Sequence, residues 1–392
     1  MVNREETGIV RADVAYSGLG TPLFDGAVVL KRERTQVKVL SIESYGSAVK
    51  GFPNAVALGK VFAISPAPVN AHTHLDLSDM PYQANSYEKF IRKVVRHRRR
   101  ATDPVEAVKI GIRKLLDSGT KTVGDVVVSD AAMRFILKHS DLSGVAYFEV
   151  LEPDPTLAKQ VFYETEQRIK EYKALEKPGG IKVGISLHSP HTVSEPLLRE
   201  ISALSIRRKL PLQIHVAETP AETAFHRDGT GTLRDLLGDL VRNWKPSGLT
   251  PVRYLAKIGV LEAQPTLVHM VHVDEADVRE VQRAGCTVVH CPRSNTNLKC
   301  GRFPWAMFAK HGTTVAIGTD SLGSSQSLSV YEEIHEALTL HGKAISPRAL
   351  VRSAVKGGHR ALGLQPPKIL RGDDQTSFQL WDSKGPITDM GM

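Results

Sequence analysis

The chain has 392 residues, of which 41% are hydrophobic and 24% are charged, and its formal net charge is +9. This composition is typical of a soluble globular protein, and no run of about eighteen apolar residues predicts a membrane-spanning helix. The N-terminal segment lacks the apolar core of a secretory signal, and three cysteines fit a reducing cytosol better than a disulfide framework. We therefore expect a cytoplasmic protein, built as one large barrel with an appendage or as two to three domains.

The two ends of the chain have a β-rich character that differs from the middle. The first 58 residues contain runs such as GIVRADVAY and TQVKVLSIES, separated by glycine, and the tail after Pro367 contains SFQLWD. We predict that residues 1–58 and 367–392 combine into one small β-sandwich domain, which is contiguous in space but not in sequence.

From about residue 60, short β-rich segments alternate with amphipathic helical patterns. One helix is well delimited, because Asp103 can cap it, Pro104 suits its first turn and Glu106 occupies the capping-box position. Eight such β/α repeats predict an α/β fold with a (β/α)8 TIM barrel over residues 59–366. The predicted strands span residues 61–69, 121–127, 144–150, 181–187, 211–216, 266–270, 286–290 and 313–318.

Histidine and acidic residues are concentrated at the C-terminal ends of these strands, where the active sites of such barrels lie. The side chains found there are His72, His74, His188, His191, His215, Glu218, His269, His272, His290, Arg293 and Asp320. On an extended strand end, His72 and His74 point the same way because residues i and i+2 share a face. With His215 and Asp320 they could form a site of three nitrogen donors and one oxygen donor, which suits zinc.

Five motifs follow one another at these strand ends: NAHTHL, HVAE, LVH, HCPRSN and GTDSLGSSQSL. Their order resembles the amidohydrolase superfamily, in its nucleoside and base deaminase branch. The resemblance implies that His72, His74, His215 and Asp320 bind the metal. It predicts one zinc ion per chain, because the end of the fourth strand lacks the lysine that bridges two metals in dinuclear relatives. Iron or manganese can share such ligands.

The resemblance also implies the catalytic roles. Zinc lowers the pKa of a bound water to near 7, and His269 is expected to contact that water. His269 and Asp320 can accept its proton. Glu218 is expected to shuttle a proton to the ring nitrogen beside the carbon that bears the amine, which makes that carbon electrophilic.

Two details resemble the aminodeoxyfutalosine deaminases of menaquinone biosynthesis, namely HLDLS after the metal pair and CPRSN together with GTDSLGSSQSL. The substrate of that family is an adenine nucleoside carrying a benzoate group. Arg293 could pair with this carboxylate, and an ion pair within the protein or a helix-capping role is its alternative. His188, Glu149 and Ser321 are also assigned to substrate binding, with a structural role open for His188 and a bridging metal contact open for Glu149. His191 stands where relatives often have tyrosine.

Other functions remain open at this point. The same site could deaminate S-adenosylhomocysteine, methylthioadenosine, guanine or 8-oxoguanine, or could hydrolyse an amide. A non-catalytic scaffold would be expected to lose its metal ligands first. The basic run from Arg92 to Arg100 fits a solvated helix face, a nucleic-acid patch or a surface that attracts an anionic small substrate. We expect a small-molecule substrate rather than a nucleic acid or a membrane as partner, with a homodimer as one option for the assembly.

Overall fold

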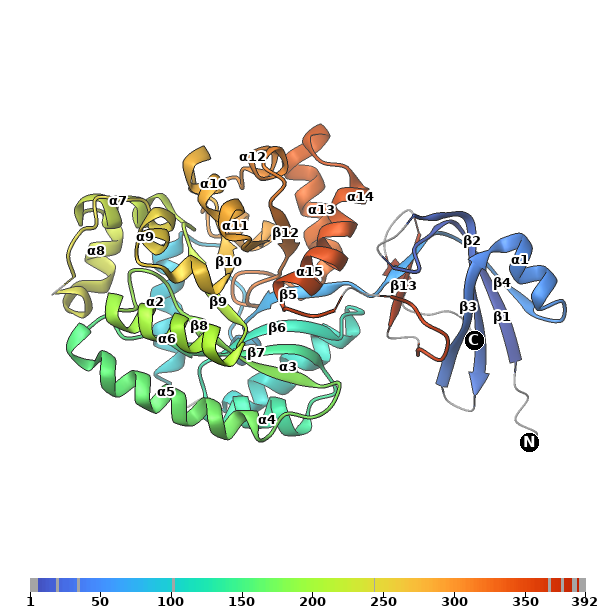
Figure 1. Cartoon of the computed structure of the whole chain (residues 1–392), viewed down its shortest axis with the longest axis horizontal. Coiled ribbons are helices and arrows are strands. Elements are labelled where there is room, and N and C mark those ends of the chain that lie inside the picture. Colours follow the sequence, from blue (N-terminus) through green and yellow to red (C-terminus); the bar gives the residue numbers. More distant parts are fainter. Residues whose placement is uncertain are drawn as a thin grey trace. The chain divides into compact units, whose positions relative to one another are not determined.

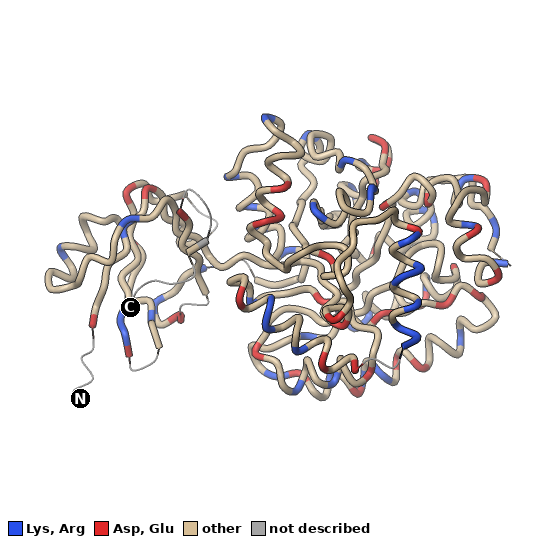
Figure 2. The backbone as a smooth tube through the Cα atoms, turned by 180° about the vertical axis from the view of Figure 1, so that it is seen from behind, with Lys and Arg blue, Asp and Glu red and all other residues tan. Residues whose placement is uncertain are grey.

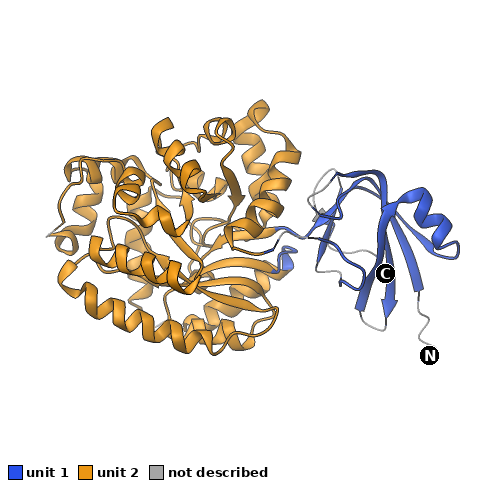
Figure 3. Cartoon of the chain, in the orientation of Figure 1, with its two compact units in different colours: residues 1–68, 117–121, 365–392 blue, residues 69–116, 122–364 orange. Residues whose placement is uncertain are grey.

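Figure 1 shows the chain as a computed structural model, which describes residues 6–18, 21–33, 36–100, 103–242, 244–365, 368–374, 377–382 and 386–387. Two compact units make up the chain. One comprises residues 1–68, 117–121 and 365–392, and the other comprises residues 69–116 and 122–364 (Figure 3). None of the helices within the described residues combines the length and the apolar character that crossing a bilayer requires.

The first unit is built on a six-stranded sheet to which both ends of the chain contribute, as predicted. In spatial order its strands are β14 (Pro386–Ile387), β13 (Phe378–Trp381), β4 (Val56–Pro66), β1 (Glu6–Ala15), β2 (Leu23–Glu33) and β3 (Gln36–Ser44). Residues of β2 alternate between the two faces: Val28 and Leu30 are buried on one, and Val29 is buried on the other with Ala48 of helix α1 (Tyr45–Gly51). The described strands form one continuous sheet.

The prediction of a single strand over residues 61–69 was wrong. Residues 61–66 belong to β4 of the small sheet, and the first barrel strand, β5 (Val69–Thr73), begins three residues later. The chain breaks there because Pro66 and Pro68 have no N–H group to donate to a sheet ladder. The first unit accordingly extends to residue 68 rather than 58.

The second unit is an eight-stranded parallel barrel, which confirms the predicted (β/α)8 fold (Figure 1). A bridge between Thr73 and Asp320 brings the first strand beside the last. Each predicted strand other than the first agrees with the structure to within one residue at either end. After β5 the strands are β6 (Thr122–Val127), β7 (Ser143–Val150), β8 (Ile181–Leu187), β9 (Leu212–Val216), β10 (Thr266–His269), β11 (Thr287–His290) and β12 (Thr314–Ile317).

Helices follow the barrel strands and lie around them (Figure 1). The predicted cap of α3 is present, because Asp103 accepts the backbone N–H groups of Val105 at 2.9 Å and Glu106 at 3.3 Å. The helices of this unit are α2 (Tyr87–Arg98), α3 (Pro104–Asp117), α4 (Asp130–His139), α5 (Ala158–Lys173), α6 (Glu195–Arg208), α7 (Pro220–Asp228), α8 (Thr232–Leu237), α9 (Pro251–Lys257), α10 (Glu275–Ala284), α11 (Pro292–Asn297), α12 (Trp305–Lys310), α13 (Val330–His341), α14 (Pro347–Arg352) and α15 (Gly358–Ala361).

Gly144 marks a place where two barrel strands approach each other closely. Its φ of +114° is one that residues with a side chain rarely adopt, and a Cβ there would lie 2.1 Å from the carbonyl oxygen of Val123. Val123 pairs with Gly144 in the ladder between β6 and β7. The backbone atom that a Cβ would meet is therefore fixed, and the position requires glycine.

We expect Gly144→Ala to lower the free energy of unfolding by about 3 kcal/mol, because backbone strain and overpacking each cost roughly 1–3 kcal/mol. Gly46 of α1 is the matched control, since a Cβ there meets nothing within 4 Å and alanine favours a helix. Gly46→Ala should leave stability equal or slightly higher. Urea unfolding measures both variants, and equal midpoints would contradict the strain argument.

Candidate metal centre and active site

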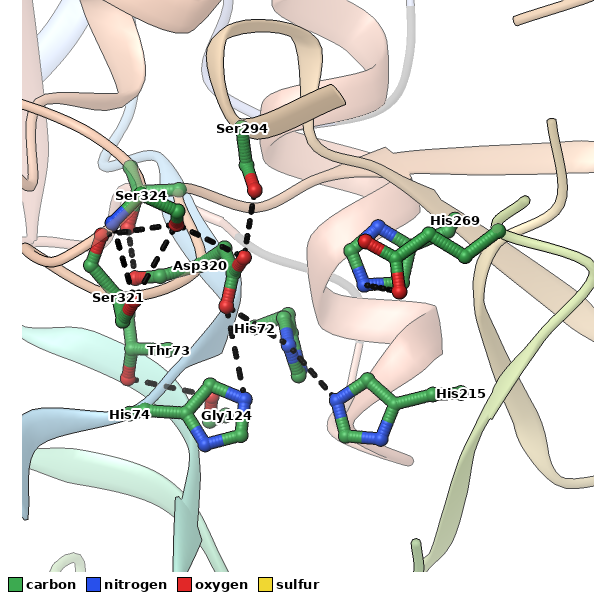
Figure 4. Close-up of polar contacts among 12 residues, drawn as sticks. His72, Thr73, His74, Gly124, His215, His269, Ser294, Asp320, Ser321 and Ser324 are labelled. Atoms are coloured by element: carbon green, nitrogen blue, oxygen red, sulfur yellow. Dashed lines mark hydrogen bonds and ion pairs between the residues drawn. The ribbon is translucent and has the colours of Figure 1, made fainter. Parts of the chain in front are cut away.

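Three histidines converge at the C-terminal end of the barrel. His72 and His74 come from β5 and His215 from β9, and one ring nitrogen of each lies within 4.8 Å of the others (Figure 4). Asp320, just beyond β12, directs its Oδ1 toward the same point, at 3.7 Å from His72 Nε2 and 3.5 Å from His74 Nε2. The barrel therefore brings together all four residues that were predicted as metal ligands.

The hydrogen bonds behind two of these histidines fix where their protons lie. His215 Nδ1 is 2.8 Å from the carbonyl oxygen of His188, which can only accept, so this Nδ1 carries the proton. His72 Nδ1 is 2.7 Å from Gln213 Oε1, and the amide nitrogen of Gln213 donates to the Ala71 carbonyl. Both histidines thus present an unprotonated Nε2, and these two nitrogens lie only 3.3 Å apart.

Such a pair of lone pairs is unfavourable unless something positive lies between them. Burial and the neighbouring imidazoles lower the pKa values of His74 and His215 well below the usual range, so these rings are neutral near pH 7. His74 Nδ1 is buried and has no hydrogen-bond partner within the described part of the chain. Three imidazoles and one carboxylate directed at the same point form a donor set that fits a divalent metal ion.

Two hydroxyl groups hold the carboxylate. Ser294 Oγ donates to Asp320 Oδ2 at 2.6 Å and Ser324 Oγ donates to the same atom at 2.9 Å, which leaves Oδ1 facing the histidines (Figure 4). Burial alone would raise the pKa of Asp320, but His72, His74 and His269 hold it well below its usual value. Asp320 is therefore ionised at the centre of the site.

Beside this set lies a carboxyl–imidazole pair suited to proton transfer. His269, at the end of β10, places Nε2 3.7 Å from Oε2 of Glu218, while the Cys300 thiol donates to Glu218 Oε1 at 3.5 Å. Burial, with the nearby Glu222 and Asp320, raises the pKa of Glu218 well above its usual value. Burial lowers the pKa of His269 to about 4. The raised pKa of Glu218 favours its protonated form and the lowered pKa of His269 favours its neutral form, as general acid–base chemistry requires.

Left-handed backbone places several of these groups. Ala217 (φ 54°), His269 (φ 73°) and Asp320 (φ 59°) all lie in a conformation that residues with a side chain seldom adopt, and each follows or ends a barrel strand. Strained backbone of this kind persists only where surrounding contacts enforce it, and it is concentrated at functional sites.

Glu222 supplies one such contact, and the sequence analysis missed it. Its carboxylate accepts the backbone N–H groups of Ala217 at 2.8 Å, Glu218 at 2.8 Å and Thr219 at 3.1 Å. These bonds turn the chain after β9 and aim Glu218 at the site. The capping box that Thr219 and Glu222 form at the start of α7 was the signal that could have revealed it.

Residues 63–368 match the sequence model of the amidohydrolase family. The chain belongs to this family. It is 41% identical over 383 residues to aminodeoxyfutalosine deaminase of Deinococcus radiodurans, covering 95% of this chain and 90% of that protein. It is 28% identical over 362 residues to 5-methylthioadenosine/S-adenosylhomocysteine deaminase of Pelotomaculum thermopropionicum, covering 89% and 79%.

Solved structures share the fold of this amidohydrolase. Helicobacter pylori aminofutalosine deaminase superposes with a TM-score of 0.79 at 20% identity, covering 98% of this chain and 94% of that one. The same protein in complex with methylthio-coformycin gives a TM-score of 0.80. An adenosine deaminase from Xanthomonas campestris with bound zinc gives a TM-score of 0.71 at 20% identity, covering 96% and 92%.

The predicted substrate-binding residues of the amidohydrolase lie at the C-terminal ends of barrel strands and differ in their hydrogen bonding. His188 Nδ1 is 2.7 Å from Thr192 Oγ1, and its ring centroid is 5.6 Å from that of His215. Glu149, near the end of β7, has a buried Oε1 to which no described residue forms a hydrogen bond. Ser321 is buried and bonded within its own turn to Ser324. Only Glu149 thus leaves a buried polar atom unused among these three.

Arg293 occupies the alternative role that the sequence left open for it, an ion pair inside the protein. Its Nε donates to Glu333 Oε1 at 2.8 Å and its Nη2 to the Ser327 carbonyl at 2.7 Å, while Nη1 pairs with Glu332. The Glu333 side chain is fully buried and that of Arg293 is 14% exposed. These contacts engage each guanidinium nitrogen and tie α11 to α13, so the structure offers no free fork for a substrate carboxylate.

We expect Arg293→Met to destabilise the amidohydrolase by about 3–5 kcal/mol, because removal of one partner leaves the buried carboxylate of Glu333 without its counter-charge. Arg242→Met is the control, since Arg242 and Asp239 form an exposed pair, and its unfolding midpoint should not change measurably. Thermal unfolding measures both. A variant of normal stability whose KM alone rises would instead assign Arg293 to substrate binding.

The basic run combines both a solvated and a buried part. Arg92, Arg96 and Arg99 of this run are exposed at α2 and its end, where Figure 2 shows a succession of basic residues. Arg98 turns inward and binds Asp76 with both terminal nitrogens, at 3.0 and 3.5 Å, and the Asp76 side chain is 1% exposed. The run is therefore more than a solvated helix face.

His191, which stands in place of a tyrosine, packs against a second buried histidine. Its ring centroid lies 6.2 Å from that of His226, which also contacts Trp244 and Tyr254. His226 is fully buried, and neither of its ring nitrogens has a hydrogen-bond partner among the residues that the structure describes. Burial lowers the pKa of His226 to about 3. The unfolded chain therefore binds a proton here below about pH 6.5 that the folded amidohydrolase does not bind.

We expect this histidine to destabilise the fold as pH falls from 6.5 toward 3, by up to about 1.4 kcal/mol per pH unit. His226→Phe should remove that contribution, so the difference in unfolding free energy between variant and wild type should rise with acidity. Urea midpoints at pH 8, 6.5 and 5.5 measure it, with pH 8 as the reference where the imidazole is neutral in both states. Parallel pH profiles would refute the assignment.

Proposed function

We propose that this amidohydrolase is a metal-dependent deaminase that hydrolyses 6-amino-6-deoxyfutalosine to futalosine and ammonia, in the cytoplasm, as a step of menaquinone biosynthesis. The observation that carries the proposal is the buried pair of Glu218 and His269, 3.7 Å apart beside the donor set of three histidines and Asp320. The name of the Deinococcus radiodurans relative, which covers most of the chain at 41% identity, supports the choice of substrate.

We assign one zinc ion to His72, His74, His215 and Asp320, with iron or manganese as the alternatives that the same donors accept. When bound, such an ion supplies a Lewis acid and makes water a stronger nucleophile at neutral pH. Gln213 and the carbonyl of His188 hold His72 and His215 in the tautomers that leave both Nε2 atoms free to coordinate.

The residues of this chain divide the proton transfers between them. Glu218, held by Cys300 at one oxygen, delivers a proton to the ring nitrogen next to the carbon that bears the amine. His269 Nε2 accepts a proton from the water that adds to that carbon. His269 then passes this proton to the amine, the carbon–nitrogen bond breaks and ammonia leaves. The added hydroxyl group becomes the carbonyl of the product and returns its proton to Glu218. Positioned acid–base groups of this kind typically contribute about 10²–10⁴-fold.

Glu149, His188 and Ser321 are proposed to contact the nucleoside, since each lies at or just beyond the C-terminal end of a barrel strand. The unpartnered Oε1 of Glu149 is suited to accept a hydroxyl group of a ribose. A homodimer stays a prediction.

Deamination of 5-methylthioadenosine or S-adenosylhomocysteine is the second candidate. Arg293, which the sequence analysis assigned to the benzoate group of aminodeoxyfutalosine, is bound to Glu333 and Glu332 instead. Its presence therefore does not favour aminodeoxyfutalosine over the two nucleosides. The Pelotomaculum thermopropionicum relative covers 89% of the chain at 28% identity, which also favours testing these nucleosides.

A deamination screen followed by ultraviolet absorbance tests the proposal. It compares aminodeoxyfutalosine, adenosine, methylthioadenosine, S-adenosylhomocysteine, guanine and 8-oxoguanine on protein of measured metal content. We expect aminodeoxyfutalosine to react best, and Glu218→Gln to lose at least about 100-fold in kcat with unchanged metal content. Glu262→Gln, at an exposed position, is the control that should keep full activity.

Three results would count against the proposal. Preferred turnover of methylthioadenosine or S-adenosylhomocysteine would select the second candidate. Full activity of Glu218→Gln would remove the proton shuttle. If no aminated ring reacts although the metal is bound, the deaminase function fails and amide hydrolysis becomes the function to test.

A further inference from the structure

A chain of four buried polar side chains extends from His269 away from the metal centre. His269 Nδ1 is 3.0 Å from Asn295 Oδ1, Asn295 Nδ2 is 3.4 Å from His290 Nδ1, and His290 Nε2 is 3.3 Å from His341 Nε2. All four side chains are at most 5% exposed. The contacts join α11, the end of β11 and the end of α13.

The amide of Asn295 sets the direction of every hydrogen bond in this chain. Its oxygen can only accept, so His269 must carry its proton on Nδ1. Its nitrogen can only donate, so His290 Nδ1 is unprotonated and the His290 proton lies on Nε2. That proton is donated to His341 Nε2, which leaves the His341 proton on Nδ1. One amide thereby fixes the tautomers of three histidines.

Aromatic packing holds the middle of the chain in place. The His290 ring stacks on Phe303 with centroids 4.3 Å apart and planes inclined by 13°, and Trp305 lies against both His290 and His341. Burial also lowers the pKa of His341 to about 4, in keeping with a neutral imidazole. The surroundings thus favour a fixed neutral network over a mobile charged one.

We infer that Asn295, His290 and His341 are positioning residues, which hold His269 in the tautomer whose Nε2 faces Glu218 and can accept a proton. The inference rests on the proposed role of His269 in deamination. This series of hydrogen bonds does not conduct protons, because the amide of Asn295 would have to lose one proton and gain another to transfer a proton between the histidines. Its contribution is the orientation and tautomer of one ring.

Helix α11 combines this task with a second one. Ser294 donates to Asp320, and the next residue, Asn295, accepts from His269, so two adjacent side chains orient two adjacent groups of the site. Arg293 ties the same helix to Glu333 of α13, the helix that also carries His341. Two separate links to α13 therefore support α11.

The tautomers can be measured in zinc-loaded protein labelled with ¹⁵N at histidine, since the two ring nitrogens of a neutral imidazole differ in chemical shift according to which carries the proton. We expect Nδ1–H at His269 and His341 and Nε2–H at His290. The opposite tautomer at His269 or His290, or a charged ring at either, would overturn the inference.

Two substitutions of Asn295 separate positioning from general structural support. In Asn295→Leu, His269 should lose its single tautomer and kcat should fall about 10–100-fold, with KM and zinc content nearly unchanged. In Asn295→Asp the carboxylate can only accept, so His290 must reverse to Nδ1–H and His341 to Nε2–H while His269 keeps its tautomer. This variant should retain more activity than Asn295→Leu. An unreversed His290 in Asn295→Asp would contradict the inference.

A variant at His341, the last residue of this hydrogen-bonded series, tests the inference even if the Asn295 variants do not fold. His341→Phe should lower kcat several-fold and release the tautomer of His290, whereas His335→Phe, an exposed position on the same helix, should do neither. Equal kcat values in the two variants would show that His341 has no positioning role. The tautomers are measured without substrate, so the two claims can fail separately. If the predicted tautomers are observed in a protein that deaminates no substrate, the proposed function is rejected and the positioning of His269 by Asn295 still holds.

Discussion

Two imidazole nitrogens that both carry lone pairs lie 3.3 Å apart at the end of the barrel. No proton lies between them, because each ring has already committed its proton to a carbonyl or amide oxygen on its other side. Their repulsion must be offset, and a divalent cation is the group whose chemistry fits. His72 and His215 come from strands far apart in the sequence, so cation binding should stabilise the barrel at the point where its strand ends converge.

The same use of directed hydrogen bonds recurs around the metal centre. Each functional group has one atom bound by the protein and another that faces the site: Asp320 is held through Oδ2, Glu218 through Oε1 and His269 through Nδ1. Ser294 holds the side chain of Asp320, whereas Glu222 accepts the backbone N–H groups of Ala217 and Glu218. Glu222 thereby supports the left-handed backbone at Ala217, a conformation that costs of order 1–3 kcal/mol.

Periodic patterns made much of this fold predictable. Barrel strands and the cap of α3 are local features, and the rule that active residues follow strand ends located the residues of the candidate metal centre without knowledge of any contact. The hydrogen-bond and ion-pair partners of these residues were not predictable, because the two members of each pair are distant in sequence. Gln213 binds His72, which is 141 positions away, and Glu333 binds Arg293, which is 40 positions away. The first strand was misplaced for a local reason, since an apolar run interrupted by Pro66 and Pro68 was taken as continuous.

The shared sheet at the chain ends has a consequence during synthesis. Strand β4 pairs with β1 on one side and with β13 on the other. During synthesis, about 310 residues must be translated after β4 before β13 is available to pair with it. At roughly 5–20 residues per second, that edge stays open for about 15–60 s while the barrel is being made. An unpaired strand edge is a template for association with other chains, so nascent chains of this protein should depend on chaperone binding near β4 until translation ends.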